Sequence, residues 1–174
     1  MSQALDNYRQ LLTRIDALCK GITDALDEQI TCSEGCSSCC TAITLFPVEA
    51  AALCAALEAL TDDEREAILQ HVAEHVDGER CPLLSHHRCL LYDARPIICR
   101  THGLPILYSE DDQRRLDCCP LNVIEGETLA GSAIIDLDKL NTLLVAVNSL
   151  YLSQTDTPAE PERLTIAESL LSKK

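Results

Sequence analysis

Eleven cysteines in a chain of 174 residues limit most strongly how this sequence can fold, because nearly all of them fall in two segments. The first segment, CSEGCSSCC, holds Cys32, Cys36, Cys39 and Cys40. The second holds Cys81, Cys89, Cys99, Cys118 and Cys119. A disulfide framework, a metal site and a reactive thiol centre are the three kinds of structure that would explain so much sulfur.

The N-terminal sequence and the cysteine count argue against disulfides. MSQALDNYRQLLTRID has no basic stretch followed by an apolar block, so it does not have the form of a signal peptide. No apolar run approaches the roughly 20 residues of a membrane-spanning helix. We therefore expect a cytoplasmic protein without a membrane partner, in a compartment where thiols stay reduced. The odd number of cysteines also prevents complete pairing within one chain.

The apolar residues predict a mainly α fold. With one Phe, four Tyr and no Trp, the core has to be built from aliphatic side chains, which favours packed helices. Residues 1–30 carry apolar residues at spacings of three and four and predict a long amphipathic helix packed on the domain. Further helices are predicted over residues 47–60, from the capping box Thr61–Glu64 to about Asp77, from Leu137, and after a cap at Thr157.

Residues 79–125 lose this periodicity and contain five cysteines and four prolines. A connection of this length without regular structure is unusual in a compact domain unless a ligand orders it. The prediction is a small helical domain with two Cys-rich loops ordered around a metal site. In this division residues 1–30 form the N-terminal helix, 31–125 the cysteine-cluster metal-binding region and 126–174 the C-terminal helices of the same domain.

The cysteine spacing favours a metal site over a redox pair. Cys36-x-x-Cys39 presents two thiolates to one metal centre, but it also matches thioredoxin-like pairs, which belong to a βαβ setting that this chain lacks. The second segment does not have the close pairs of a zinc ribbon. Because adjacent residues point in different directions, Cys39 and Cys40 suit two neighbouring centres, or two corners of one cluster, better than one tetrahedral ion.

The chain resembles the CxxCxxCC cysteine-cluster family of zinc- or iron-chelating domains. The resemblance rests on CSEGCSSCC and on a C-x-x-Y-x-x-R-P-x-x-C-R block formed by Cys89, Tyr92, Arg95, Pro96, Cys99 and Arg100. It spans roughly residues 32–120 and departs from the family pattern at the first gap, which is three residues from Cys32 to Cys36. It implies metal binding and, in some longer members, a place within or beside enzymes such as a flagellin lysine methylase.

The RPxxCR block also has a physical interpretation. Pro96 suits a helix start and would aim Cys99 one turn further on. Arg95 and Arg100 would ease the burial of thiolates around a metal ion; the alternative is pairing with surface carboxylates. His102 is a reserve ligand, and one of Cys118 and Cys119 is expected to ligate. Cys19 and Cys54 lie on apolar helix faces and are interpreted as core residues.

The predicted function is metal binding, with iron–sulfur favoured over zinc and a structural or redox role. The predicted ligands are Cys32, Cys36, Cys39, Cys40, Cys81, Cys89, Cys99, Cys118 and Cys119, supported by Arg95 and Arg100. The net charge of −14 argues against nucleic acid. An enzyme or enzyme accessory of redox or methyl-transfer type, and a thiol or metal-storage switch, remain alternatives. No Gly-rich nucleotide loop or Ser-His-Asp order supports catalysis.

Overall fold

The computed structural model describes residues 3–32, 35–122, 129–155 and 162–172 and is mainly helical, as the sequence predicts. Its α-helices are α1 (Asp6–Leu26), α2 (Pro47–Glu58), α3 (Asp62–Glu74), α4 (Ile97–Thr101), α5 (Leu137–Thr155) and α6 (Ile166–Leu171). No helix in the described ranges has both the length and the apolar character needed to cross a membrane. The cap predicted at Thr157 lies outside the described residues; the terminal helix α6 is capped by Thr165 and Glu168 instead.

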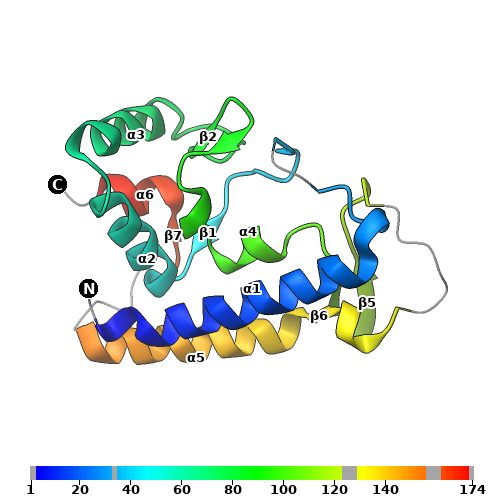
Figure 1. The fold of residues 1–174 in the computed structure, drawn as a ribbon. Coiled ribbons are helices and arrows are strands. Elements are labelled where there is room, and N and C mark those ends of the chain that lie inside the picture. The colour runs from blue at the N-terminus through cyan, green and yellow to red at the C-terminus, as the bar shows by residue number, and fades with distance from the viewer. Residues whose placement is uncertain (1–2, 33–34, 123–128, 156–161, 173–174) are drawn as a thin grey trace.

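Two long helices form one side of the molecule. In Figure 1, α1 and α5 run side by side in opposite directions, and α4 lies above them. The predicted seam of α1 is confirmed, since Tyr8, Ile15, Ile22 and Leu26 are buried with residues of α5 and α4 in one core cluster. Leu11 is also buried in this cluster, whereas its neighbour Leu12 is only partly buried against it.

Helices α2, α3 and α6 enclose a second core cluster. The predicted capping box of α3 is confirmed: the Glu64 carboxylate accepts from the Thr61 N–H, and the Glu64 N–H donates to the Thr61 hydroxyl. The helix ends at Glu74, one turn before the predicted end near Asp77. Cys81 and Cys89 pack against this cluster from the side of a small hairpin.

Apart from the helix start expected at Pro96, residues 79–122 contain regular structure that the sequence did not predict. The segment forms the hairpin β2 (Leu84–Ser85) and β3 (Arg88–Cys89), the helix α4, and the hairpin β4 (Ile106–Glu110) and β5 (Gln113–Asp117). Strand β6 (Ile135–Asp136) adds to β4 in parallel, and β1 (Thr44–Leu45) pairs with β7 (Leu164–Thr165). The expectation of an irregular loop over this whole segment was therefore wrong.

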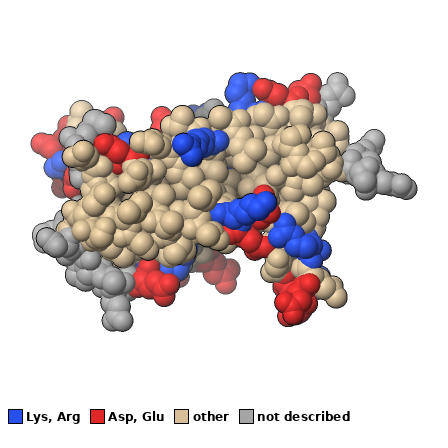
Figure 2. Space-filling view, turned by 90° about the horizontal axis from the view of Figure 1, so that it is seen from below, with Lys and Arg blue, Asp and Glu red and all other residues tan. Residues whose placement is uncertain are grey.

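Charged side chains are unevenly distributed over the surface. Figure 2, which views the molecule from below Figure 1, shows a broad area of uncharged residues, with a few Lys and Arg within it and Asp and Glu mostly towards its edges. Leu143, Val145 and Leu150 of α5 are exposed, and α5 has no charged residue after Lys139. The greater part of α5 therefore contributes no acidic residue to the surface.

Candidate metal centre

Backbone pairing brings the two cysteine segments together. Thr41 and Arg80 form an antiparallel bridge, the Ala42 N–H donates to the Glu79 carbonyl (3.0 Å), and the Cys81 N–H donates to the Cys40 carbonyl (3.1 Å). Because these bonds fix the register, Cys40 lies beside Cys81 although 41 positions separate them in the sequence.

The β2–β3 hairpin also holds the first segment. Its turn consists of His86 and His87, both with positive φ, a conformation that is uncommon for residues other than glycine. His87 Nδ1 lies 3.0 Å from the Ser37 hydroxyl, and the Arg80 guanidinium donates to the Ser37 carbonyl. Ser37 is buried, so these contacts dock the loop that carries Cys36, Cys39 and Cys40 against the hairpin.

Helix α4 carries the next predicted ligand. Pro96 precedes the helix, as the sequence predicts, and the Cys99 N–H donates to its carbonyl (3.1 Å). The start of α4 is fixed by Glu49, a buried residue of α2 whose carboxylate accepts from the Ile97 N–H (3.2 Å) and the Phe46 N–H (3.1 Å). One carboxylate therefore holds two helix N-termini and sets where Cys99 lies.

Four thiols lie close together where these elements meet, and we call them the inner cysteine group: Cys40, Cys81, Cys89 and Cys99. Burial, together with the neighbouring thiols of Cys81, Cys89 and Cys40, raises the pKa of Cys99 to about 12. Burial likewise raises the pKa of Cys81 to about 11, again with contributions from Cys89 and Cys40. Thiols that raise one another's pKa form a group that is ionised most easily when a cation neutralises it.

Backbone N–H groups lie near two of these sulfurs. Those of Leu83 and Leu84 lower the pKa of Cys81, and that of Leu91 lowers the pKa of Cys89, in each case against the larger effect of burial. The same local arrangement occurs twice, because a tight turn follows each of the two cysteines. Hydrogen bonds to sulfur stabilise thiolates in metal and iron–sulfur sites.

Arg95 supplies a further donor beside the inner group. Its guanidinium lies 3.4 Å from the centroid of the Tyr92 ring and lowers the pKa of Cys89 and Cys99 against the larger effect of burial. Its Nε atom is buried without a hydrogen-bond partner in the structure. An unpaired buried donor near Cys89 and Cys99 fits a site built for thiolates, which accept hydrogen bonds and carry negative charge.

Arg100 has different surroundings. Its Nη1 donates to both oxygens of Asp16 on α1 (2.8 and 2.9 Å), and its Nε donates to the Arg95 carbonyl (2.8 Å). This is the carboxylate pairing that the sequence left open as the alternative. Arg100 therefore ties α4 to α1, and Arg95 is the arginine that lies near the sulfurs.

A second set of thiols lies on the more exposed side, and we call it the outer cysteine group: Cys32, Cys36, Cys39 and Cys119. The Cys32 and Cys119 side chains are hydrogen-bonded, and Cys36 lies close enough to raise the pKa of Cys32 and Cys39, in both of which burial is the larger cause. The side chains of Cys39 and Cys40 are also hydrogen-bonded, so the two groups meet at this adjacent pair.

Asn122 holds the outer group together. Its Oδ1 accepts from the Thr31 N–H (3.0 Å) and from the Cys32 thiol (3.6 Å), and its Nδ2 donates to the Gly103 carbonyl (2.6 Å). The Cys119 N–H donates to the same carbonyl (3.3 Å). This one buried amide thus joins three chain segments around Cys32.

Gly103 leaves room for that arrangement. Its φ is +92°, and a Cβ added there would lie 2.8 Å from the Cys32 sulfur. Only glycine combines this left-handed backbone with so close an approach. Cys32 is therefore packed against the turn that follows α4, which supports its place beside Cys119 despite the longer gap to Cys36.

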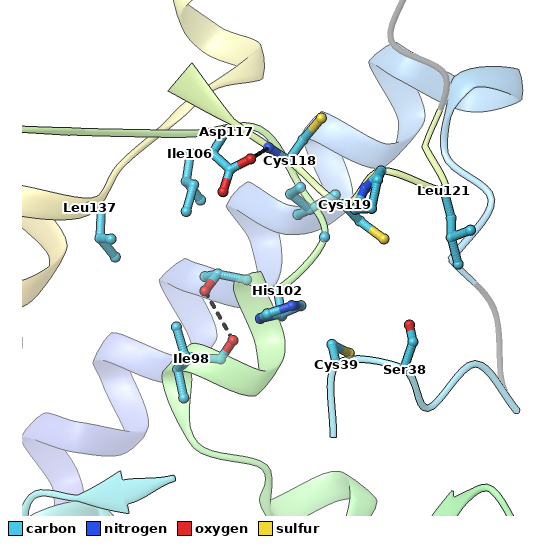
Figure 3. A pocket seen from close by; sticks show the side chains of 14 residues that line it. Ser38, Cys39, Ile98, His102, Ile106, Asp117, Cys118, Cys119, Leu121 and Leu137 are labelled. Atoms are coloured by element: carbon cyan, nitrogen blue, oxygen red, sulfur yellow. Dashed lines mark hydrogen bonds between the residues drawn. The ribbon is translucent and has the colours of Figure 1, made fainter. Parts of the chain in front are cut away.

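Figure 3 separates the two adjacent cysteines of the second segment. The Cys119 side chain points towards the side on which Cys39 and Ser38 lie, whereas the Cys118 sulfur points away from them. His102, the reserve ligand, lies between Ile98 and the Cys119 side. Of the remaining cysteines, Cys54 is buried in a core cluster, as predicted, and its thiol donates to the Ser169 carbonyl (3.0 Å).

The groups are defined by proximity and not by ligand geometry. Among the residues that the structure describes, no three His, Cys, Asp or Glu side chains are arranged so that they could hold a metal ion. Sequence reasoning missed Asn122 and Glu49, which act across long sequence separations.

A small helical fold whose cysteines converge from two segments defines a cysteine-cluster protein. The sequence model of the CxxCxxCC family, described as "Putative zinc- or iron-chelating domain", matches residues 31–124, which is more than half of the chain. The protein belongs to this family, as its sequence motifs predict. The searches find no similar curated protein and no similar solved structure.

Proposed function

We propose that this protein binds metal through two thiolate centres, one at the inner and one at the outer cysteine group. The observation that carries the proposal is the mutual proximity of Cys40, Cys81, Cys89 and Cys99, of which Cys89 lies in β3, Cys99 in α4 and the other two in loops. Four thiolates suit either zinc or an iron–sulfur cluster. Membership of a zinc- or iron-chelating family supports the same chemistry.

The inner centre is proposed to be the more stable one. Its sulfurs lie near the N–H groups of Leu83, Leu84 and Leu91 and beside Arg95, whereas Cys32 of the outer group is exposed. Arg95, and not Arg100, is the arginine that we assign to this centre. Cys118 points away and is left outside both.

The loose cysteine spacing of the second segment favours iron–sulfur over zinc, as does the adjacent Cys39–Cys40 pair. Anaerobic purification followed by metal and sulfide analysis tests this. Brown protein with matching iron and acid-labile sulfide is the expected result. Colourless protein with two equivalents of zinc would overturn the iron–sulfur assignment and keep the two centres, whereas protein without bound metal would overturn the function itself.

A thiol switch is the second candidate, favoured by the hydrogen-bonded pair of Cys32 and Cys119. It predicts variable metal content and a fold that survives chelation. The proposed centres predict the opposite, because the free energy of metal binding is then part of folding. Hydrogen exchange before and after chelation decides between them: loss of protection across residues 79–122 supports the metal centres, and unchanged protection supports the switch.

A further inference from the structure

A cavity of about 470 Å³ opens beside the outer cysteine group. Cys39, Cys118, Cys119 and His102 line one part of it, and the rest is largely aliphatic, with Ile98, Leu104, Ile106, Leu121 and Leu137. Figure 3 shows lining side chains that converge from α4, from β4, from the turn after β5, from the start of α5 and from the loop that carries Cys39. The volume lies within the range of small-molecule sites.

Two of the lining side chains are large, apolar and exposed. Ile98 is 40% exposed and Leu121 is 54% exposed, so both leave apolar surface in water at the cavity. Apolar side chains that surround a concave site mark a place where a ligand can remove that surface from water. Cys39 and Cys119 lie at the same site, which distinguishes it from a plain depression of the core.

The charges of the lining exclude one class of ligand. No Lys or Arg is among the lining residues that the structure describes, and the only lining carboxylate is that of Asp117. An anionic ligand would meet the Asp117 carboxylate without a Lys or Arg from the described lining to offset it, whereas an uncharged ligand has no such cost.

We propose that this cavity binds a small, uncharged, largely apolar organic molecule against the outer cysteine group. Its place beside a metal centre rests on the proposed function; the binding itself does not. A ligand held here would cover Cys39 and Cys119 and shield the outer centre from solvent, while the inner group stays on the far side of the Cys39–Cys40 pair.

The test uses two fluorescent probes on the metal-loaded protein. N-phenyl-1-naphthylamine is uncharged, and 8-anilino-1-naphthalenesulfonate has the same aromatic skeleton with an added sulfonate. We expect the uncharged probe to bind one site per chain at least 10-fold more tightly than the sulfonate. Ile98→Trp and, as a second variant, Leu121→Trp fill the cavity and should each weaken its binding at least 10-fold. Leu143→Trp, exposed on α5 and outside the cavity lining, should leave it unchanged.

Metal release to a chelator locates the probe. Saturating uncharged probe should slow release of the outer metal at least 3-fold and leave the inner metal unaffected. Absence of probe binding to fully loaded protein, equal binding of both probes, or equal effects of Ile98→Trp and Leu143→Trp would overturn the cavity proposal. Unchanged release of both metals would overturn its place beside the outer group. Metal analysis of the same samples shows separately whether the proposed function fails.

Discussion

Replacing Asn122 by alanine should empty the outer centre and leave the inner one intact. Asn122 is buried, and its amide bonds to Thr31, Cys32 and Gly103 join the segments that carry Cys32 and Cys119. Loss of these bonds removes the restraint on Cys32 but touches none of Cys40, Cys81, Cys89 and Cys99. The metal content per chain should therefore fall by the amount that one of the two centres holds.

The size of the stability change follows from the bonds lost. The variant leaves the partly buried Thr31 N–H and part of the Gly103 carbonyl without a partner, which costs about 2–3 kcal/mol. For a chain of this length that corresponds to a fall in Tm of roughly 4–12 °C. Differential scanning calorimetry and metal analysis on the same sample measure both effects.

Asn148 provides a matched control. It is also a buried asparagine, but its side chain accepts the Val48 N–H (3.1 Å) at the start of α2, away from the inner and outer cysteine groups. Asn148→Ala should cost about 1–2 kcal/mol and keep the full metal content. Equal metal loss in the two variants, or a full metal content in Asn122→Ala, would refute the assignment of Asn122 to the outer group.

Three further changes test other parts of the account. Cys99→Ser should lose metal and stability, whereas Cys19→Ser and Cys54→Ser should keep the full metal content. Elemental analysis that shows equal metal loss in all three variants would contradict the division of the cysteines into ligands and core residues. Glu49→Ala leaves the buried Ile97 N–H and the partly buried Phe46 N–H, at the starts of α4 and α2, unpaired. It should lower the unfolding free energy in urea by about 2–4 kcal/mol; a loss below about 0.5 kcal/mol would speak against this anchor. Burial raises the pKa of the Cys19 thiol from 9.0 to about 11, so its contribution to stability is complete below pH 9 and is lost as the pH rises through 11. Over the range between these two pKa values, Tm should fall less in Cys19→Ala than in the wild-type protein. Identical profiles of Tm against pH would refute this contribution of Cys19.

The parts of the fold that were predicted correctly depend on local signals. The capping box of Thr61 and Glu64 and the helical periodicity of α1 and α5 act within a few residues, so the sequence alone reveals them. The segment 79–122 was expected to be irregular because its strands β2 and β3 have two residues each, too few to show an alternating pattern. Its turn uses His86 and His87 where glycine or asparagine is the usual signal.

The candidate site shows the same limit. The motifs around Cys89 and Cys99 identified the family, but which thiols lie together depends on contacts between distant segments. The Cys81 N–H bond to the Cys40 carbonyl sets one group, and the Asn122 bonds set the other. Neither pairing leaves a trace in local spacing. The orientation that separates Cys118 from Cys119 likewise depends on the turn after β5.

Native mass spectrometry of anaerobically purified protein tests the central claim, two separate thiolate centres, most directly. The wild-type chain should carry two metal centres, and Cys99→Ser and Cys32→Ser should each carry one. Loss of both centres in either single variant while the chain stays folded, or a single centre in the wild-type chain, would contradict the account.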